Sequence, residues 1–434
     1  MLHVQNDEIS KSKKTFIKIN KKPNFMSLSK RLTKDLDTKT KKEGGIYFTP
    51  RPIIKSVLSF IIQYNKNHNL EISMVLEPSF GSGEFIRHID SRFKNITITG
   101  VEMNKLIYDS VKKSSLFKRK RNNINLLNHN FMKYETDSKY DLIIGNPPFF
   151  VMSKKDIATE YHQFLEGRPN IFLLFILKSL NLLIPNGILA FVLPKSSMNC
   201  LYYRKVRSHI YDNYTILRVR DYPKATFLET QQEVCVVWIQ NRKPEIDSNM
   251  KYVYKLNGNI IFNSNTKKLG KLLKKSINLD TFGFNVHVGK VVWNQVKDKL
   301  TEDSSKTRLI YSSDIVNNTI GIKTYKNKEK KNYIDKIGLT DPLLVVNRGY
   351  GKGKYKFSYA LVDTDKPYQI ENHLICISQK DTLDKKKLLE KYKIIMNSFE
   401  RPQTEKFVHY YFGNNSINTE ELQYILPIYG VLDI

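Results

Sequence analysis

The sequence predicts an α/β fold in which helices cover both faces of a mostly parallel sheet. Between about residues 46 and 241, short apolar runs alternate with segments that have helical apolar spacing. Such alternation is typical of sheets built from strand–helix–strand units. The last two apolar runs, 214–219 and 234–239, are too close together for a helical crossover. We therefore expect them to form an antiparallel pair at one edge of the sheet.

The expected elements follow one another along the chain, starting with a helix over 56–64. After it we expect strands at 72–76, 96–101, around 125, 142–144 and 189–193, with helices from about 84, over 171–184 and over 201–211. Pro185, Asn186 and Gly187 interrupt the apolar stretch at 171–193. This stretch is therefore interpreted as a helix, a turn and a strand, and not as a membrane span.

Length and composition predict three regions. The chain has 434 residues, of which 41% are hydrophobic and 26% charged, enough for two domains with separate cores. Residues 1–43 are rich in lysine and poor in apolar runs, so we expect a basic, flexible arm. Residues 44–244 are predicted to form the α/β domain. Residues 245–434, with short strand-like runs among lysine-rich loops, are predicted to form an α+β domain.

The net charge of +29 indicates a polyanionic partner, either nucleic acid or an acidic membrane surface. The 25 tyrosines and 23 phenylalanines favour nucleic acid, because bases stack on such rings. A source proteome rich in lysine is the alternative explanation. Cys200, Cys235 and Cys376 are widely separated, which favours a reducing compartment over a disulfide framework. The polar N-terminus lacks a secretory pattern, so we expect a cytoplasmic or nuclear protein that is not secreted.

A strand, a glycine loop and a helix in succession predict a nucleotide-type binding site around Glu77, Gly81 and Gly83. The third glycine of a dinucleotide fingerprint is replaced by Ile86, which disfavours a pyrophosphate ligand. Glu77 suits a cationic group such as an amino-acid ammonium. Glu102 ends the next strand, where it can accept both hydroxyls of a ribose. This combination fits S-adenosyl-L-methionine better than NAD.

Two further segments are expected near this ligand. Asn130 and Phe131 follow the third strand, where an amide and an apolar ring would hold an adenine; an exposed Asn beside a core Phe is the structural alternative. Thr49 followed by Pro50 is an N-cap and first-turn signal. The same segment would also direct a hydroxyl and backbone amides toward the ligand.

The motif Asn146-Pro147-Pro148-Phe149 directly follows the strand at 142–144. It offers a side-chain amide oxygen, a prolyl carbonyl restrained by its ring, and a flat aromatic face. Two acceptors beside a stacking surface suit a planar conjugated amine such as the amino group of adenine, whose lone pair is delocalised into the ring. A tight turn after a buried strand is the alternative interpretation.

In this order, the Tyr47–Pro50 segment, the Glu77 glycine loop, Glu102 and the Asn146 motif resemble the gamma-class N6-adenine DNA methyltransferases of restriction–modification systems. The resemblance covers about residues 45–240. It implies a Rossmann-like class I methyltransferase sheet, S-adenosyl-L-methionine as the cofactor, and an adenine flipped out of double-stranded DNA as the acceptor. It also implies that residues 245–434 recognise the DNA sequence.

The resemblance assigns roles to individual residues. Asn146 and Pro147 would hold the target amino group, Pro148 belongs to the same catalytic motif, and Phe149 and Phe227 would pack on the flipped base. The residues implied to bind the cofactor are Tyr47, Thr49, Glu77, Gly81, Gly83, Glu102, Met103, Asn130, Phe131 and Asn146. Asn130 departs from the aspartate that is usual in this class, so it keeps an acceptor oxygen and loses the charge.

The loop at 347–355 interleaves basic, aromatic and flexible residues, which suits contact with phosphates and bases. Its candidate DNA-binding residues are Asn347, Arg348, Lys352 and Lys354; a solvated glycine hairpin is the alternative. Residues 152–169 are expected to form a mobile flap over the site. We expect a monomer with no bound metal and no membrane partner. A separate cognate restriction endonuclease is a potential partner.

Two other functions remain open from the sequence. One is methylation of RNA adenine or of a protein glutamine, which the long basic C-terminal region argues against. The other is a catalytically silent nucleic-acid-binding protein on the same fold. Retention of every expected site residue except the one at position 130 argues against this second alternative.

Overall fold

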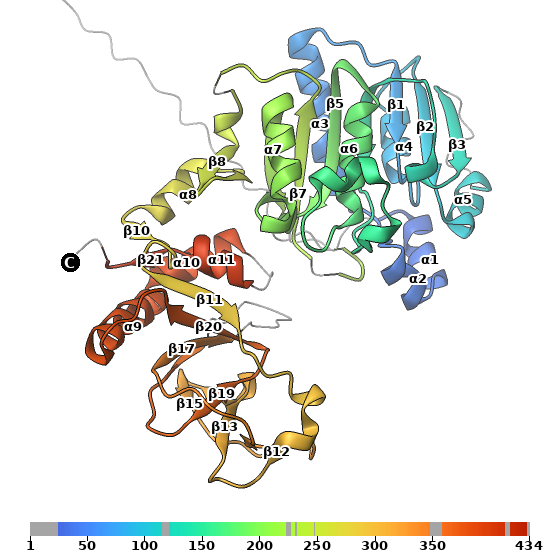
Figure 1. The fold of residues 1–434 in the computed structure, drawn as a ribbon. Coiled ribbons are helices and arrows are strands. Elements are labelled where there is room, and N and C mark those ends of the chain that lie inside the picture. Colours follow the sequence, from blue (N-terminus) through green and yellow to red (C-terminus); the bar gives the residue numbers. More distant parts are fainter. Residues whose placement is uncertain are drawn as a thin grey trace, which may run out of the picture.

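The computed structural model describes residues 25–114, 121–222, 227–230, 232–246, 248–347, 358–412 and 417–431. Its largest sheet has seven strands in the order β3-β2-β1-β4-β5-β7-β6 (Figure 1). The strands are β1 (Met74–Glu77), β2 (Thr97–Glu102), β3 (Asn123–Asn128), β4 (Tyr140–Gly145), β5 (Leu183–Pro194), β6 (Thr215–Tyr222) and β7 (Val234–Gln240). Six strands run parallel to one another, and β7 runs antiparallel to them between β5 and β6. The predicted α/β fold class and the antiparallel edge pair are confirmed.

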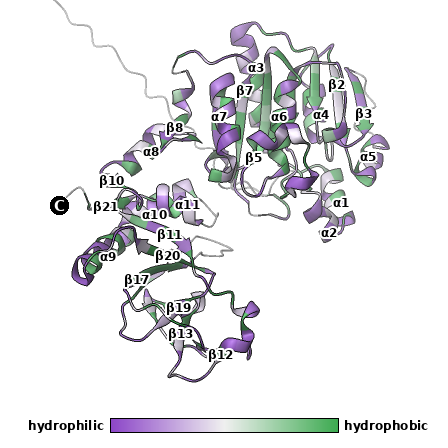
Figure 2. Ribbon diagram, in the orientation of Figure 1, coloured by the Kyte–Doolittle hydropathy of each residue, from purple (hydrophilic) through white to green (hydrophobic). Residues whose placement is uncertain are grey.

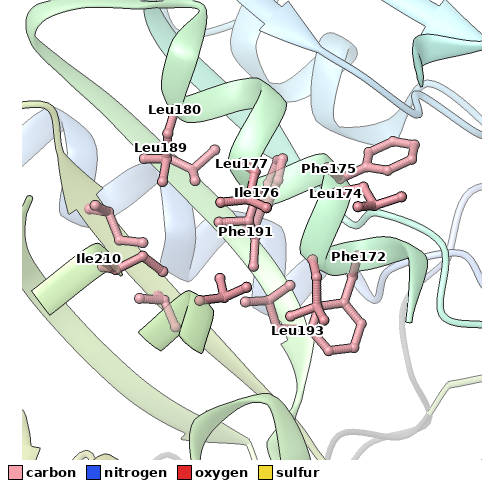
Figure 3. Packing of buried hydrophobic residues seen from close by; sticks show 14 of the residues in the cluster. Phe172, Leu174, Phe175, Ile176, Leu177, Leu180, Leu189, Phe191, Leu193 and Ile210 are labelled. Atoms are coloured by element: carbon pink, nitrogen blue, oxygen red, sulfur yellow. The ribbon is translucent and has the colours of Figure 1, made fainter. Parts of the chain in front are cut away.

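Helices cover both faces of this sheet. One face packs against α3 (Arg51–His68), α4 (Glu84–Asp90) and α5 (Lys105–Lys112), and the other against α6 (Ile171–Asn181) and α7 (Arg204–Asn213). Figure 3 shows apolar side chains of α6 packed toward Leu189, Phe191 and Leu193 of β5. The inner strands β1, β4 and β7 are mostly hydrophobic, whereas hydrophilic residues follow the outer surfaces of α5 and α7 (Figure 2). The centre of the sheet is therefore buried on both faces, as a mostly parallel sheet requires, and the edge strand β3 is partly exposed.

The expected turn at residues 185–187 is instead part of a strand. The helix ends at Asn181, and β5 begins at Leu183. The pairing with β4 shifts register between Tyr140 and Leu142, and Asn186 has a φ of 64°. A bulge of this kind accommodates the proline and the left-handed residue without ending the strand.

The prediction of a flexible N-terminal arm is wrong for residues 25–43. They form α1 (Ser27–Asp35) and α2 (Thr38–Glu43), and the arm prediction for residues 1–24 lies outside the described residues. Leu28, Leu32 and Leu36 of this segment are buried in the core that α3 and α4 share. Three leucines at helical spacing outweigh the high local content of lysine because they bury apolar surface against the domain.

The remaining residues form a mixed α and β unit, shown below the large sheet in Figure 1. Two four-stranded sheets run in the orders β11-β20-β17-β18 and β12-β16-β13-β19. The strands are β8 (Val253–Leu256), β9 (Asn259–Phe262), β10 (Ser276–Ile277), β11 (Phe284–Val288), β12 (Leu300–Thr301), β13 (Thr307–Ile310), β14 (Ile315–Val316), β15 (Thr319–Ile320), β16 (Tyr333–Ile334), β17 (Leu343–Asn347), β18 (Tyr359–Val362), β19 (Tyr368–Ile370), β20 (Leu374–Gln379) and β21 (Ile428–Tyr429). The helices are α8 (Thr266–Leu273), α9 (Lys385–Glu400), α10 (Pro402–Tyr411) and α11 (Thr419–Tyr424). The α+β character agrees with the sequence analysis, and the boundary near residue 244 stays a prediction.

Candidate functional site at the carboxyl edge of the sheet

Three adjacent parallel strands carry the central residues of the site. In the pairing of β1 with β2, Glu77 lies opposite Gly100, and in the pairing of β1 with β4, Leu76 lies opposite Ile143. Glu77, Glu102 and Asn146 therefore lie at or just beyond the carboxyl ends of their strands. This edge is where open α/β sheets bind their ligands.

A cavity of about 520 Å³ lies at this edge. Eight of the predicted site residues line it: Tyr47, Gly81, Glu102, Met103, Asn130, Phe131, Asn146 and Pro148. Thr49 and Glu77 line a small adjoining pocket that shares Tyr47, Gly81 and Asn146 with the cavity. Pro147 and Phe149 are next to residues that line the cavity, and Gly83 is next to Ser82 and Glu84 of the adjoining pocket, but none of the three lines the cavity itself. Most of the residues predicted for one ligand are thus brought to one place.

The side chain of Asn146 is held at one end and left unpaired at the other. Its Nδ2 donates a hydrogen bond of 2.9 Å to the backbone carbonyl of Tyr47. Its Oδ1 is buried and has no hydrogen-bond partner among the described residues. A buried acceptor without a donor costs about 1–3 kcal/mol. The amide nitrogen is thus fixed, and the oxygen is left as an unsatisfied acceptor in a side chain that lines the cavity.

Gly45 allows the Tyr47 segment to lie directly against the Asn146 motif. Its φ is +58°, and a Cβ atom at this position would lie 2.6 Å from the backbone nitrogen of Phe149. Only glycine is compatible with both conditions. The sequence analysis missed this residue, although the Gly44-Gly45 pair just before Tyr47 was a signal for it.

Glu77 and Glu102 are carboxylates in a dry environment. Burial raises the pKa of Glu77 well above its usual range and raises the pKa of Glu102 to about 6. The Oε2 of Glu77 is buried without a hydrogen-bond partner among the described residues. A buried carboxylate of this kind is stabilised by a cationic ligand group.

Glu102 also holds the glycine loop in place. Its two carboxylate oxygens accept hydrogen bonds from the backbone N–H groups of Gly81 at 3.0 Å and Asn104 at 2.8 Å. Each oxygen keeps further acceptor capacity, so the predicted contact with ribose hydroxyls stays compatible with these bonds. Gly81 and Gly83 have φ values of +52° and +75°, which accounts for glycine at both positions.

The far end of the cavity is apolar and is formed around Phe131, which is 2% exposed. Its ring lies 4.9 Å from the ring of Phe175 and 5.3 Å from the ammonium of Lys178. The same ammonium donates to the carbonyl of Met132 at 3.0 Å. Phe175 and Lys178 were missed because they lie on α6, about 45 residues after Phe131.

Asn130 has a different local role from the one expected. Its Oδ1 accepts the backbone N–H of Met132 at 2.9 Å and caps the short turn at Phe131–Lys133. The amide oxygen can accept one more hydrogen bond. The predicted hydrogen bond from an adenine amine would therefore have to use the remaining acceptor site of this oxygen.

Thr49 is not the N-cap of α3. Pro50 takes that position, and its side chain makes no capping hydrogen bond. Phe227 is 7% exposed and lines a separate cavity of about 10 Å³ with Phe48 and Lys41, so the structure does not place it at the main cavity. Its packing against α1 and α2 could not be foreseen while residues 1–43 were expected to be flexible.

The predicted flap lies over the site. An isolated bridge between Val151 and Asn170 closes its base, and residues 156–158, 160 and 161 line the cavity. Its mobility stays a prediction. Among the candidate DNA-binding residues, Arg348, Lys352 and Lys354 lie outside the described residues, and Asn347 ends β17.

Residues 45–227 match the model of the Eco57I restriction-modification methylase family. This region is therefore similar to a restriction-modification methylase domain. The match runs from Gly45 to Phe227 and so contains the whole cavity wall formed by the strand ends. A methylase family agrees with S-adenosyl-L-methionine as the cofactor.

Curated relatives extend the similarity beyond the methylase domain. The chain is 28% identical over 415 residues to the type II methyltransferase M.CvrRI of Paramecium bursaria Chlorella virus XZ-6E, covering 94% of this chain and 99% of that one. It is 27% identical over 399 residues to the modification methylase CviBIII of Paramecium bursaria Chlorella virus NC1A, covering 90% and 96%. The type II methyltransferase M.AccI of Acinetobacter calcoaceticus is 30% identical over 200 residues, covering 44% and 36%.

The residues of the cavity and of the small adjoining pocket fit S-adenosyl-L-methionine. The unpaired carboxylate oxygen of Glu77 suits the ammonium of its methionine part, and the apolar surface at Phe131 suits its adenine. Within the described ranges, no group of three or more His, Cys, Asp or Glu side chains could hold a metal ion. No helix in the described part of the chain is long and apolar enough to cross a membrane.

Proposed function

We propose that this protein transfers a methyl group from S-adenosyl-L-methionine to the N6 amino group of an adenine that is flipped out of a specific sequence in double-stranded DNA. The observation that carries the proposal is the buried, unpaired Oδ1 of Asn146 next to the prolines of its motif. The restriction-modification match and the net charge of +29 support DNA as the acceptor.

The chain's contribution to the reaction is to orient the amine. Asn146 Oδ1 and the carbonyl of Pro147 would accept the two N–H bonds of N6, which draws its lone pair out of the ring and toward the methyl carbon. The bound cofactor supplies an electrophilic methyl group on a sulfonium. N6, held by Asn146 and Pro147, would accept this methyl carbon as the bond from that carbon to sulfur breaks, and N6 would release one proton to solvent.

Phe149 would supply the stacking surface for the flipped base. Its ring is partly buried and lies 6.0 Å from that of Phe172, in an edge-on arrangement. This contact, together with packing against both hydrophobic clusters of the domain, holds the ring in place. A base that stacks on the ring would gain about 1–3 kcal/mol.

Incubation with a labelled methyl donor tests the proposal directly. Duplex DNA, RNA and protein are offered in parallel, and the modified group is mapped by sequencing and by mass spectrometry of nucleosides. We expect N6-methyladenine in duplex DNA at one short sequence. Label in RNA or in glutamine, or no label in any acceptor, would contradict the proposal.

Cofactor affinity is expected to fall as the pH is lowered through about 6. Burial raises the pKa of Glu102 from 4.5 to about 6, and only the ionised carboxylate accepts both ribose hydroxyls. Below that pKa, affinity should drop about tenfold for each pH unit. The raised pKa also means that ionised Glu102 lowers native stability above pH 6 when no ligand is bound. Calorimetric titration between pH 5 and 8 measures the dependence.

In the Glu102→Gln variant, cofactor affinity should depend less on pH. Only the contribution from the titration of Glu77 should remain. The exposed Glu71→Gln is the matched control and should retain the full dependence. An unchanged pH profile in Glu102→Gln would show that this carboxylate does not titrate with binding.

Ser29→Ala is expected to weaken the cofactor loop from a distance. Ser29 Oγ donates to Glu84 Oε1 at 2.7 Å and lies 2.9 Å from Ser82 Oγ, within the glycine loop. Loss of this buried pair should cost about 1–3 kcal/mol of stability and raise KM for the cofactor while kcat changes little. The control is Ser59→Ala, whose hydroxyl donates to a carbonyl on the exposed side of α3. A fall in kcat at unchanged KM would contradict this positioning role.

A further inference from the structure

The loop at 321–332 joins β15 to β16 in the C-terminal unit and is strongly basic. It contains five lysines and one glutamate. The loop has no regular secondary structure, yet all of its residues belong to the described part of the chain. It was not among the segments that the sequence analysis connected with DNA.

Tyrosine hydroxyls anchor this loop to the protein beneath it. Tyr325 Oη donates to the buried carboxylate of Asp314 at 2.8 Å, and Tyr311 Oη donates to the backbone carbonyl of Lys331 at 3.1 Å. Asn332 Nδ2 closes the loop on itself with a bond of 3.0 Å to the carbonyl of Lys323. The loop backbone is therefore held at its start, its middle and its end.

Two of the five lysines serve the loop's own structure. The ammonium of Lys330 lies 4.8 Å from the ring centre of Tyr311, 5.1 Å from that of Trp293 and 5.9 Å from that of Tyr325. Lys331 forms an ion pair of 2.6 Å with Glu302. The single acid of the loop, Glu329, is paired with Lys297 at 2.8 Å.

The other three lysines, Lys323, Lys326 and Lys328, are exposed and form no ion pair with any described residue. Their neighbouring acid is already neutralised, so the outer face of the loop carries uncompensated positive charge. Because the backbone is fixed, binding an anion here costs less ordering entropy than binding to a flexible basic tail.

We propose that Lys323, Lys326 and Lys328 form a phosphate-binding surface for duplex DNA in the C-terminal unit. The inference rests on the proposed function. A duplex carries one negative charge per about 1.7 Å of helix axis, so three ammonium groups on one short anchored loop can meet several phosphates together. Contacts of this kind position the protein on DNA and read no bases.

The test is the salt dependence of DNA binding by the full-length protein. Lys323→Gln, Lys326→Gln and Lys328→Gln are combined in one variant. Lys386→Gln, Lys393→Gln and Lys406→Gln form the control, since these lysines are exposed on α9 and α10 and the net charge changes equally. Each lost phosphate contact should reduce the slope of log K against log salt by about 0.9, so the loop variant should lose about 2 to 3. The control should keep the wild-type slope.

If the slope of log K against log salt is unchanged in the loop variant, or falls equally in both variants, the loop is not a phosphate-binding surface. The proposed function would still stand in that case, provided that the wild-type protein methylates DNA. If the loop variant loses binding to anionic phosphatidylserine vesicles but keeps its binding to DNA, the loop contacts a membrane, and the proposal is also wrong. Failure of the wild-type protein to methylate duplex DNA would instead refute the proposed function. Circular dichroism confirms that both variants fold.

Discussion

Asn146→Ala is expected to lower kcat for methyl transfer by at least about 100-fold while the cofactor still binds. Removal of one preorganised electrostatic contact to a reacting group typically costs a factor of about 10²–10³ in kcat. Here the lost contact is the Oδ1 that the structure leaves buried and unpaired. Single-turnover methylation of a substrate duplex measures the rate, and calorimetry measures cofactor binding.

The Asn146→Asp variant tests the acceptor oxygen separately from the hydrogen bond that holds the side chain in place. The aspartate keeps an oxygen for the amine but loses the hydrogen bond of 2.9 Å from Nδ2 to the Tyr47 carbonyl. We expect an activity between that of the wild type and that of Asn146→Ala. Asn123→Ala, an exposed position at the opposite end of the sheet, is the control and should be fully active. Wild-type turnover in Asn146→Ala would refute the role of this residue.

Arg207→Leu is expected to destabilise the protein by about 3–5 kcal/mol, which is the usual cost of breaking a buried charged network. Arg207 lies on α7 and is 2% exposed. Its Nε donates to the carbonyl of Ile260 in β9 at 2.6 Å, and its Nη1 donates to the carbonyls of Ser197 and Cys200 at 3.2 and 2.8 Å. Leucine would remove all three of these bonds, and of the three carbonyls that of Cys200 would keep a bond from the backbone N–H of Tyr203.

Burial lowers the pKa of Arg207 to about 10, so the side chain remains charged at neutral pH. Its interaction with the buried Glu421 of α11 is part of the same network. Urea unfolding measures the loss of stability, and Arg242→Ala, an exposed arginine after β7, is the control. A change of less than about 1 kcal/mol would mean that water or neighbouring donors satisfy the carbonyls.

Sequence patterns determined those features that depend on residues close together in the chain. The strand–loop–helix order around Glu77 and the Asn146 motif predicted both the α/β class and the edge of the sheet at which the cavity lies. They could do so because the period of apolar residues and the turn requirements of glycine and proline act locally. The relation between the antiparallel edge strands was predictable for the same reason.

Tertiary structure alone decided the contacts between distant segments. The bond from Asn146 to Tyr47 spans 99 positions, and the link from Ser29 to Glu84 spans 55. Residues 27–43 fold although they are rich in lysine, because three leucines are buried in the core formed with α3 and α4. Burial against such partners depends on the whole fold, so composition within a short window predicted a flexible arm where the protein forms two helices.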